Sequence, residues 1–96
     1  MTTHEQQFQS FVDALELEID KVVETGTDDE VFISGYLNGH VSLAAGYCLS
    51  HQLYSRQGLE VQVANSLESA FANNELQEPD QIAVKRYWQS CLKNVV

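Results

Sequence analysis

The segment from Val31 to Ser55 contains no Asp, Glu, Lys or Arg, although the whole chain carries 14 acidic and five basic residues. A helix that spans a bilayer needs about 20 consecutive apolar residues, so length alone permits a membrane span here. The segment also contains polar side chains that make insertion unfavourable, among them Ser34, Asn38, His40, Ser42, Ser50, His51 and Gln52. We therefore expect the central, mostly buried helix of a bundle.

Signals for the start of this helix precede the uncharged segment. Thr27 and Glu30 have the spacing of a capping box, in which each side chain bonds the free backbone N–H of the other residue. Asp28 and Asp29 add negative charge at the end of the helix where the dipole favours it. These signals predict a helix over 28–50.

Three further helices are predicted over 3–25, 59–74 and 79–93. In each of them apolar residues recur at steps of three and four, which is the period of an amphipathic helix. Gly26 stands where a residue just past a helix end is expected, and Pro79 suits a first helical turn. The polar segment from His51 to Gly58 is interpreted as a loop. The apolar stripes are Phe8, Phe11, Val12, Leu15, Ile19, Val22 and Val23 in the first helix, Leu59, Val63, Ala64, Leu67, Ala70 and Phe71 in the third, and Val84, Tyr87, Trp88, Cys91 and Val95 in the fourth.

No segment alternates between apolar and polar residues over a useful length, so strands are not expected. Four amphipathic helices with short connections predict an all-α fold, an antiparallel four-helix bundle that forms a single domain over residues 1–96. Three of the five basic residues, Lys85, Arg86 and Lys93, lie on the fourth helix. We expect that helix to be the neighbour of the acidic first helix.

The formal net charge of −9 limits the classes of partner. Nucleic acid and anionic membranes are bound through Lys and Arg, so neither is an expected partner. Cys48 and Cys91 lie on apolar stripes, where free cysteine behaves as a small hydrophobic residue. The first residues form neither a basic start nor an apolar run, and a cytoplasmic location is expected.

The predicted second helix contains a stripe of small residues, which comprises Gly35, Gly39, Ser42 and Gly46. A glycine inside a helix costs roughly 1 kcal/mol relative to alanine, so some other interaction should compensate for it. One hypothesis is the close approach of a neighbouring helix of the same chain. A second is a groove or kink where a ligand or partner contacts the backbone, and a third is that the fold simply tolerates the glycines.

Tyr36 and His40 lie one helical turn apart and can touch on one face. Such a pair can serve as an acid–base couple, but Leu43 and Ala44 provide no carboxylate to orient the imidazole. His40 and His51 are about 16 Å apart along the axis, so they cannot share a metal ion on a straight helix. We expect no catalytic residue, no metal site and no cofactor.

The run Asp28-Asp29-Glu30, Phe32, Ser34-Gly35-Tyr36-Leu37, Gly39-His40 and Leu43-Ala44 resembles the signature of the YfcL family of small bacterial proteins. Ser66-Leu67-Glu68, Ala70, Asp80-Gln81, Val84 and Trp88 resemble its later positions. The two cysteines and Asn38 do not resemble family features. The resemblance implies a cytoplasmic protein of gamma-proteobacteria with no assigned activity, so it transfers no catalytic residue.

Two hypotheses for function remain open at this point. The first is a small, non-enzymatic protein-interaction module that contacts itself or another protein through the glycine face of the second helix. The second is a small-ligand-binding or regulatory domain with a pocket near Tyr36 and His40. The candidate contact or ligand-binding residues are Gly35, Tyr36, Gly39 and His40.

Overall fold

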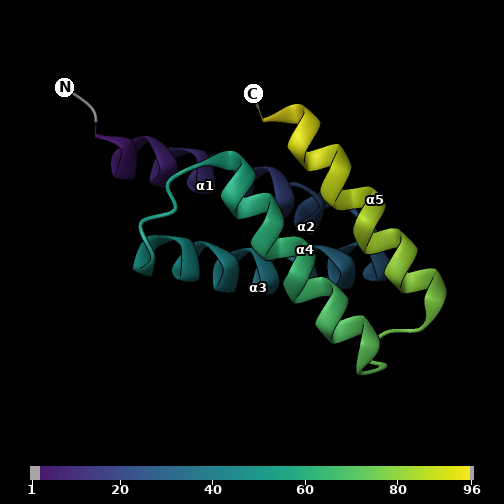
Figure 1. The fold of residues 1–96 in the computed structure, drawn as a ribbon. Helices are drawn as coiled ribbons and strands as arrows, with labels where there is room; N and C mark the ends of the chain where they lie inside the picture. Colours follow the sequence, from purple (N-terminus) through teal and green to yellow (C-terminus); the bar gives the residue numbers. More distant parts are fainter. Residues whose placement is uncertain (1–2, 96) are drawn as a thin grey trace.

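The computed structural model describes residues 3–95, which fold into helices without strands (Figure 1). The helices are α1 (His4–Asp20), α2 (Val22–Thr25), α3 (Asp28–Ser50), α4 (Arg56–Ala72) and α5 (Glu78–Asn94). The four long helices pack against one another in a bundle, which confirms the predicted fold class. Helix α3 is central, because it packs against α1, α2, α4 and α5.

Side chains cap the starts of three helices. Thr27 Oγ1 accepts a hydrogen bond from the Glu30 amide at 3.2 Å, and Glu30 Oε1 accepts one from the Thr27 amide at 2.9 Å. The predicted capping box is thus confirmed, and α3 has the predicted bounds. A second capping box joins Thr3 to Gln6 at the start of α1. These contacts satisfy N–H groups that have no partner inside the helix.

The prediction of one helix over 3–25 is wrong, because the helix breaks at Lys21. The Lys21 amide bonds to the Glu18 carbonyl, three residues back, and a separate turn, α2, follows. Val23 follows the break. Its place in the predicted apolar stripe implied burial, but its side chain is exposed. Gly26 ends α2 as expected; a Cβ there would lie 2.6 Å from the Val22 carbonyl oxygen, so the turn requires glycine.

The start of the next helix also differs from the prediction. Helix α4 begins at Arg56, and Gly58 lies in its first turn rather than in the preceding loop. The Ser55 side chain accepts a hydrogen bond from the Gly58 amide at 3.0 Å and caps the helix. Ala64, which was expected in the core, is exposed. Helix α5 agrees with its predicted bounds within one residue at each end, with Pro79 in its first turn.

One core joins the long helices. Its fully buried side chains include Leu15 and Ile19 from α1, Leu37, Val41 and Cys48 from α3, Leu59 and Val63 from α4, and Val84 from α5. Cys48 and Cys91 are both buried free thiols, as expected, and burial raises the pKa of each. None of the helices within residues 3–95 combines the length and the apolarity that crossing a membrane requires.

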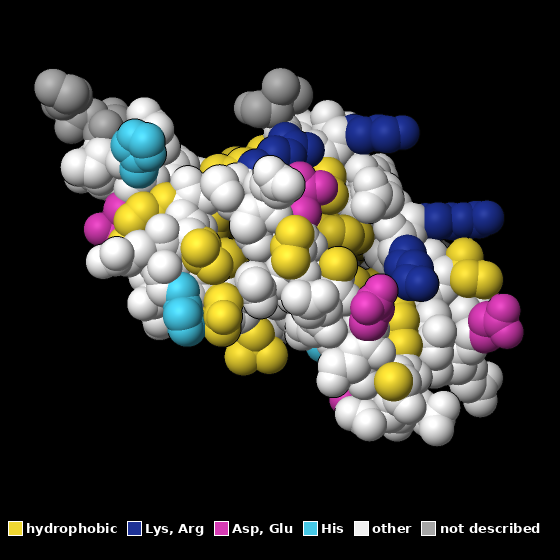
Figure 2. Space-filling model, in the orientation of Figure 1, with side chains coloured by type: hydrophobic (Ala, Val, Ile, Leu, Met, Phe, Trp, Pro, Cys, Tyr) yellow, Lys and Arg dark blue, Asp and Glu magenta, His cyan; other side chains and the backbone are white. Residues whose placement is uncertain are grey.

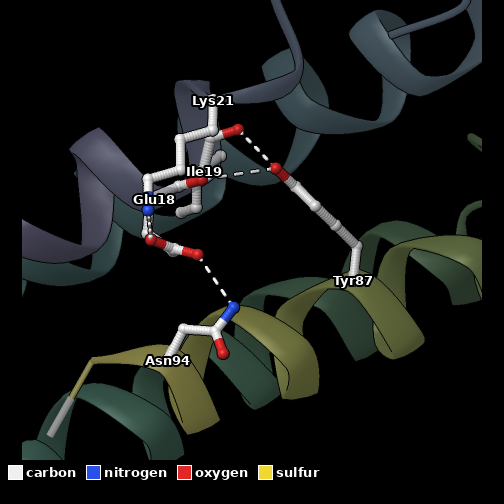
Figure 3. Close-up of polar contacts among 5 residues, drawn as sticks. All are labelled: Glu18, Ile19, Lys21, Tyr87 and Asn94. Carbon is white, nitrogen blue, oxygen red and sulfur yellow. Dashed lines mark hydrogen bonds and ion pairs between the residues drawn. The ribbon is translucent and has the colours of Figure 1, made fainter. Parts of the chain in front are cut away.

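The end of α1 is tied to two other helices through one backbone carbonyl. The Ile19 carbonyl accepts a hydrogen bond from the buried Ser34 hydroxyl of α3 at 2.7 Å and from the Tyr87 hydroxyl of α5 at 2.6 Å. Figure 3 shows Tyr87 reaching from α5 toward this carbonyl, with Asn94 bonded to the Glu18 carboxylate nearby. The last carbonyls of a helix lack partners inside it, so these bonds satisfy a group that α1 leaves open.

Helices α1 and α5 are neighbours, as the charge argument predicted, but basic side chains of α5 are not what joins them. The contacts that join them are the uncharged Tyr87 and Asn94. Lys85, Arg86 and Lys93 instead lie on the outer side of α5, where Figure 2 shows Lys and Arg side chains gathered at the right of the molecule. The ion pairs among residues 3–95 are Lys21–Glu18 and Arg56–Glu60.

Tyr87→Phe is expected to lower the free energy of unfolding by about 1 kcal/mol, because a part-buried hydrogen bond to the Ile19 carbonyl is lost. Ser34→Ala removes the second donor, and the double variant should lose more than the sum of the two, since the carbonyl is then unsatisfied. Urea unfolding measures each value. Tyr54→Phe is the matched control and should change little; strictly additive losses would contradict the shared role of the carbonyl.

Candidate contact surface

Helix α3 has a buried inner face and an exposed outer face. The inner face, which includes Ile33, Leu37, Val41, Ala44 and Cys48, packs in the core. The outer face of α3 consists of exposed residues only: Phe32, Gly35, Gly39, Ser42, Leu43, Gly46, Tyr47 and Ser50. None of these carries a charge. The face is therefore an uncharged strip on the surface of an acidic protein.

The three glycines of the outer face have open space in front of them. A Cβ added at Gly35, Gly39 or Gly46 would meet no other heavy atom within 4 Å. The hypothesis that a neighbouring helix of the same chain approaches this stripe is therefore wrong. Packing within the described chain leaves unexplained why each position is not alanine, which favours a helix by about 1 kcal/mol.

Large apolar side chains stand beside the glycines. Leu43 is 70% exposed, Phe32 is 53% exposed and Tyr47 is 45% exposed. The prediction of a mostly buried central helix is thus right for the inner face and wrong for this one. The wide apolar arc of α3 is more than the bundle covers, and its outer part faces solvent.

Tyr36 lies at the edge of the outer face and bonds to another element. Its hydroxyl donates a hydrogen bond to the Glu75 carboxylate, just beyond α4, at 3.0 Å. Burial and the neighbouring negative charge raise the pKa of Tyr36 to about 12, because both disfavour the phenolate. The phenol is therefore held in its neutral form, which is the form that anchors Glu75.

His40 is half-buried between α3 and α4. Its Nδ1 lies 2.6 Å from the Ser66 hydroxyl of α4, and its ring centroid lies 4.8 Å from that of Tyr36. The predicted Tyr36–His40 contact is thus confirmed as a contact of rings. Burial lowers the pKa of His40, against the opposing charge of Glu75. The Tyr36 hydroxyl bonds Glu75 and His40 Nδ1 bonds Ser66, so both side chains join α3 to α4 and the segment that follows it.

Five surface hollows are described on residues 3–95, and Tyr36 and His40 line none of them. A groove of 650 Å³ lies between α4 and α5, with Leu67 and Trp88 in its lining; Figure 2 shows hydrophobic side chains in this hollow. A smaller hollow of 300 Å³ adjoins the outer face of α3 at Leu43 and Tyr47. No group of three metal-ligating side chains occurs within the part of the chain that the structure describes.

Sequence reasoning identified the four candidate residues but not their partners. Ser66 and Glu75 lie 26 and 39 residues away from the side chains that they bond. Ser66 belongs to the run that resembles later positions of the family, and Glu75 lies between two predicted helices. The exposure of Phe32, Leu43 and Tyr47 was not predicted, because the whole helix was expected to be mostly buried.

Comparison with known proteins assigns the chain to a family. The family model described as YfcL protein matches residues 9–93. The uncharacterised protein YfcL of Escherichia coli strain K12 is 39% identical over 84 residues, which cover 88% of this chain and 88% of that protein. No solved structure matches the chain.

Gly39→Ala is expected to raise the free energy of unfolding of the dilute protein by up to about 1 kcal/mol, because alanine favours a helix and its Cβ meets nothing. Thermal or urea unfolding measures the change. Gly26→Ala is the matched opposite: its Cβ would press on the Val22 carbonyl oxygen, so this variant should be less stable than the parent. A destabilised Gly39→Ala protein would show that the site is filled within the chain.

The lowered pKa of His40 predicts a loss of stability as the pH falls below about 6.5. The folded protein binds fewer protons at this side chain than the unfolded chain, so protonation favours unfolding. The His40 ring should titrate in NMR with a midpoint below 6.5. His40→Gln should remove part of the stability lost between neutral and acidic pH, and an unchanged pH profile in this variant would contradict the assignment.

Proposed function

This chain belongs to the YfcL family, and we propose that it acts as a small, non-enzymatic protein-interaction module. Its contact surface is the outer face of α3. The buried free thiols Cys48 and Cys91 support a cytoplasmic location, because unpaired cysteines are typical of proteins that stay in a reducing compartment.

The observation that carries this proposal is the outer face itself, which is uncharged, apolar and exposed. The large exposed side chains of this face are Phe32, Leu43 and Tyr47. Open space lies in front of the glycines between them. A contiguous apolar patch on a soluble protein commonly marks a contact with another protein. Glycine at the same place lets a second backbone approach closely, which compensates for its cost to the helix.

The roles of Tyr36 and His40 support a non-enzymatic module. Each side chain bonds across to a residue outside α3, Glu75 and Ser66 respectively. A catalytic pair needs a cavity in which a substrate can reach it. Neither side chain lines a described hollow, although the hollow at Leu43 and Tyr47 reaches Ser66, the partner of His40. These two residues hold α3 and α4 in register behind the outer face, so we assign them to positioning the contact surface.

The proposal predicts that contacts in cells form through α3 and not through other exposed apolar positions. A photo-crosslinking phenylalanine analogue in place of Tyr47 should give a discrete adduct on irradiation of living cells. Leu43→Glu should abolish that adduct, because a charge in the face must be desolvated on contact. Gel electrophoresis and mass spectrometry identify the product.

Leu17 provides the matched control, because it is 72% exposed but lies on α1. The same analogue at Leu17 should give no discrete adduct, and Leu17→Glu should leave the adduct at position 47 unchanged. Equal crosslinking from both positions, or none from either, would show that the outer face of α3 is not a specific contact surface.

A further inference from the structure

We propose that the partner of the outer face of α3 is the same face of a second copy of this chain, packed antiparallel about a two-fold axis at the level of Val41. The inference rests on the proposed function and names the occupant of that surface. It follows from the order of large and small residues along the face, from the absence of charge and from the area available.

The order of residues along the face is self-complementary. Leu43 and Gly39 stand two residues on either side of Val41, and Tyr47 and Gly35 stand six residues on either side. In an antiparallel pair centred on Val41, residues at equal distances on opposite sides come together. The large side chains of one copy therefore meet the glycines of the other.

Two further pairs follow the same rule. Gly46 lies as far from Val41 as Tyr36, which borders the face (five residues), and Phe32 and Ser50 are each nine residues away. Every pair joins one large and one small residue, so ridges fill gaps along about 27 Å of helix. A parallel pair would instead place Leu43 against Leu43 and Tyr47 against Tyr47.

Charge also favours the antiparallel arrangement. The acidic first turn of α3 is formed by Asp28, Asp29 and Glu30. In the antiparallel pair the acidic turns of the two copies lie at opposite ends of the contact, roughly 35 Å apart along the helix axis. A parallel pair would bring the two acidic turns together. With a net charge of −9 on each copy, the uncharged strip is the surface on which two copies approach with least repulsion.

The area of the face sets the strength of the contact. The exposed parts of Phe32, Leu43 and Tyr47, together with the glycine backbone, amount to roughly 500 Å² per copy, or about 1,000 Å² in the pair. That total is at the lower limit for a specific interface. The dimer should therefore be reversible and weak, and added salt should strengthen it by screening the repulsion between the copies.

Sedimentation equilibrium of the purified protein over a concentration series tests the pairing. The parent chain should change reversibly from monomer to dimer. Gly39→Leu and Leu43→Ala should each weaken the dimer about tenfold or more, because one variant puts two large residues together and the other two small ones. The double variant Gly39→Leu/Leu43→Ala should recover affinity, since the large and small positions have exchanged places. Leu17→Ala, on α1, should have no effect.

Disulfide crosslinking tests the register. Ser42 lies one residue from the axis, so Ser42→Cys should crosslink to itself in the dimer. Ser50→Cys should not, because the two copies of this position lie about 27 Å apart along the helix. The unfolding curve of each variant establishes that it is folded, as the open space at Gly39 leads us to expect for Gly39→Leu.

Three results would overturn the self-pairing: a protein that stays monomeric at every concentration, equal crosslinking at positions 42 and 50, or a double variant no stronger than the weaker single one. A monomeric protein that still gives the position-47 adduct in cells would exclude the second copy while leaving the proposed function intact. Absence of both signals would remove the proposed function as well.

Discussion

The arrangement of this bundle depends on the hydrogen bonds made at the end of α1. The Ile19 carbonyl accepts bonds from Ser34 of α3 and Tyr87 of α5, and so joins three helices at one atom. The Ile19 carbonyl and the Ser34 hydroxyl belong to buried residues, and an unpaired polar atom there would cost about 1–3 kcal/mol. This requirement places Ser34 inward and thereby sets the rotation of α3 about its axis. The rotation decides which residues of α3 enter the core and which form the outer face.

A second set of contacts keeps the opposite side of α3 in place. Tyr36 bonds Glu75 and His40 packs on Ser66, so the α4 side of the helix is fixed by polar contacts over two turns. On the α1 side, the Asn38 amide donates to the Asp20 carboxylate at 3.1 Å. Together with the packed inner face, these contacts favour the rotation of α3 that leaves Phe32 and Leu43 outside the core.

Much of this fold could be predicted from local signals, since the capping box at Thr27, the charge-free run that follows and the first-turn Pro79 all act within a few residues. One error, the start of α4, concerns a local signal, the Ser55 side chain that caps Gly58. The other lies where distant contacts meet the chain. Lys21 ends α1 although the apolar period continues through Val22 and Val23. At this end the Ile19 carbonyl bonds to Ser34 and Tyr87, which no local pattern reveals. The site was predicted in part for the same reason. Spacing brought Tyr36 and His40 together, but Ser66 and Glu75 lie too far along the chain for any periodicity to reveal them.

The glycines illustrate how the structure changes the meaning of a sequence pattern. In the sequence, Gly35 and Gly39 are compatible both with close packing inside the chain and with a surface for another molecule. The open space in front of them removes the first explanation, and the exposed Leu43 and Tyr47 beside them add an unfavourable hydration that folding does not relieve. Both features lower the stability of the isolated chain or leave it unimproved. A second helix that lies across the face would relieve both together, because its side chains would fill the gaps at the glycines while its backbone covers the exposed apolar groups. The features that weaken α3 in the monomer are thus those that an antiparallel pair would use.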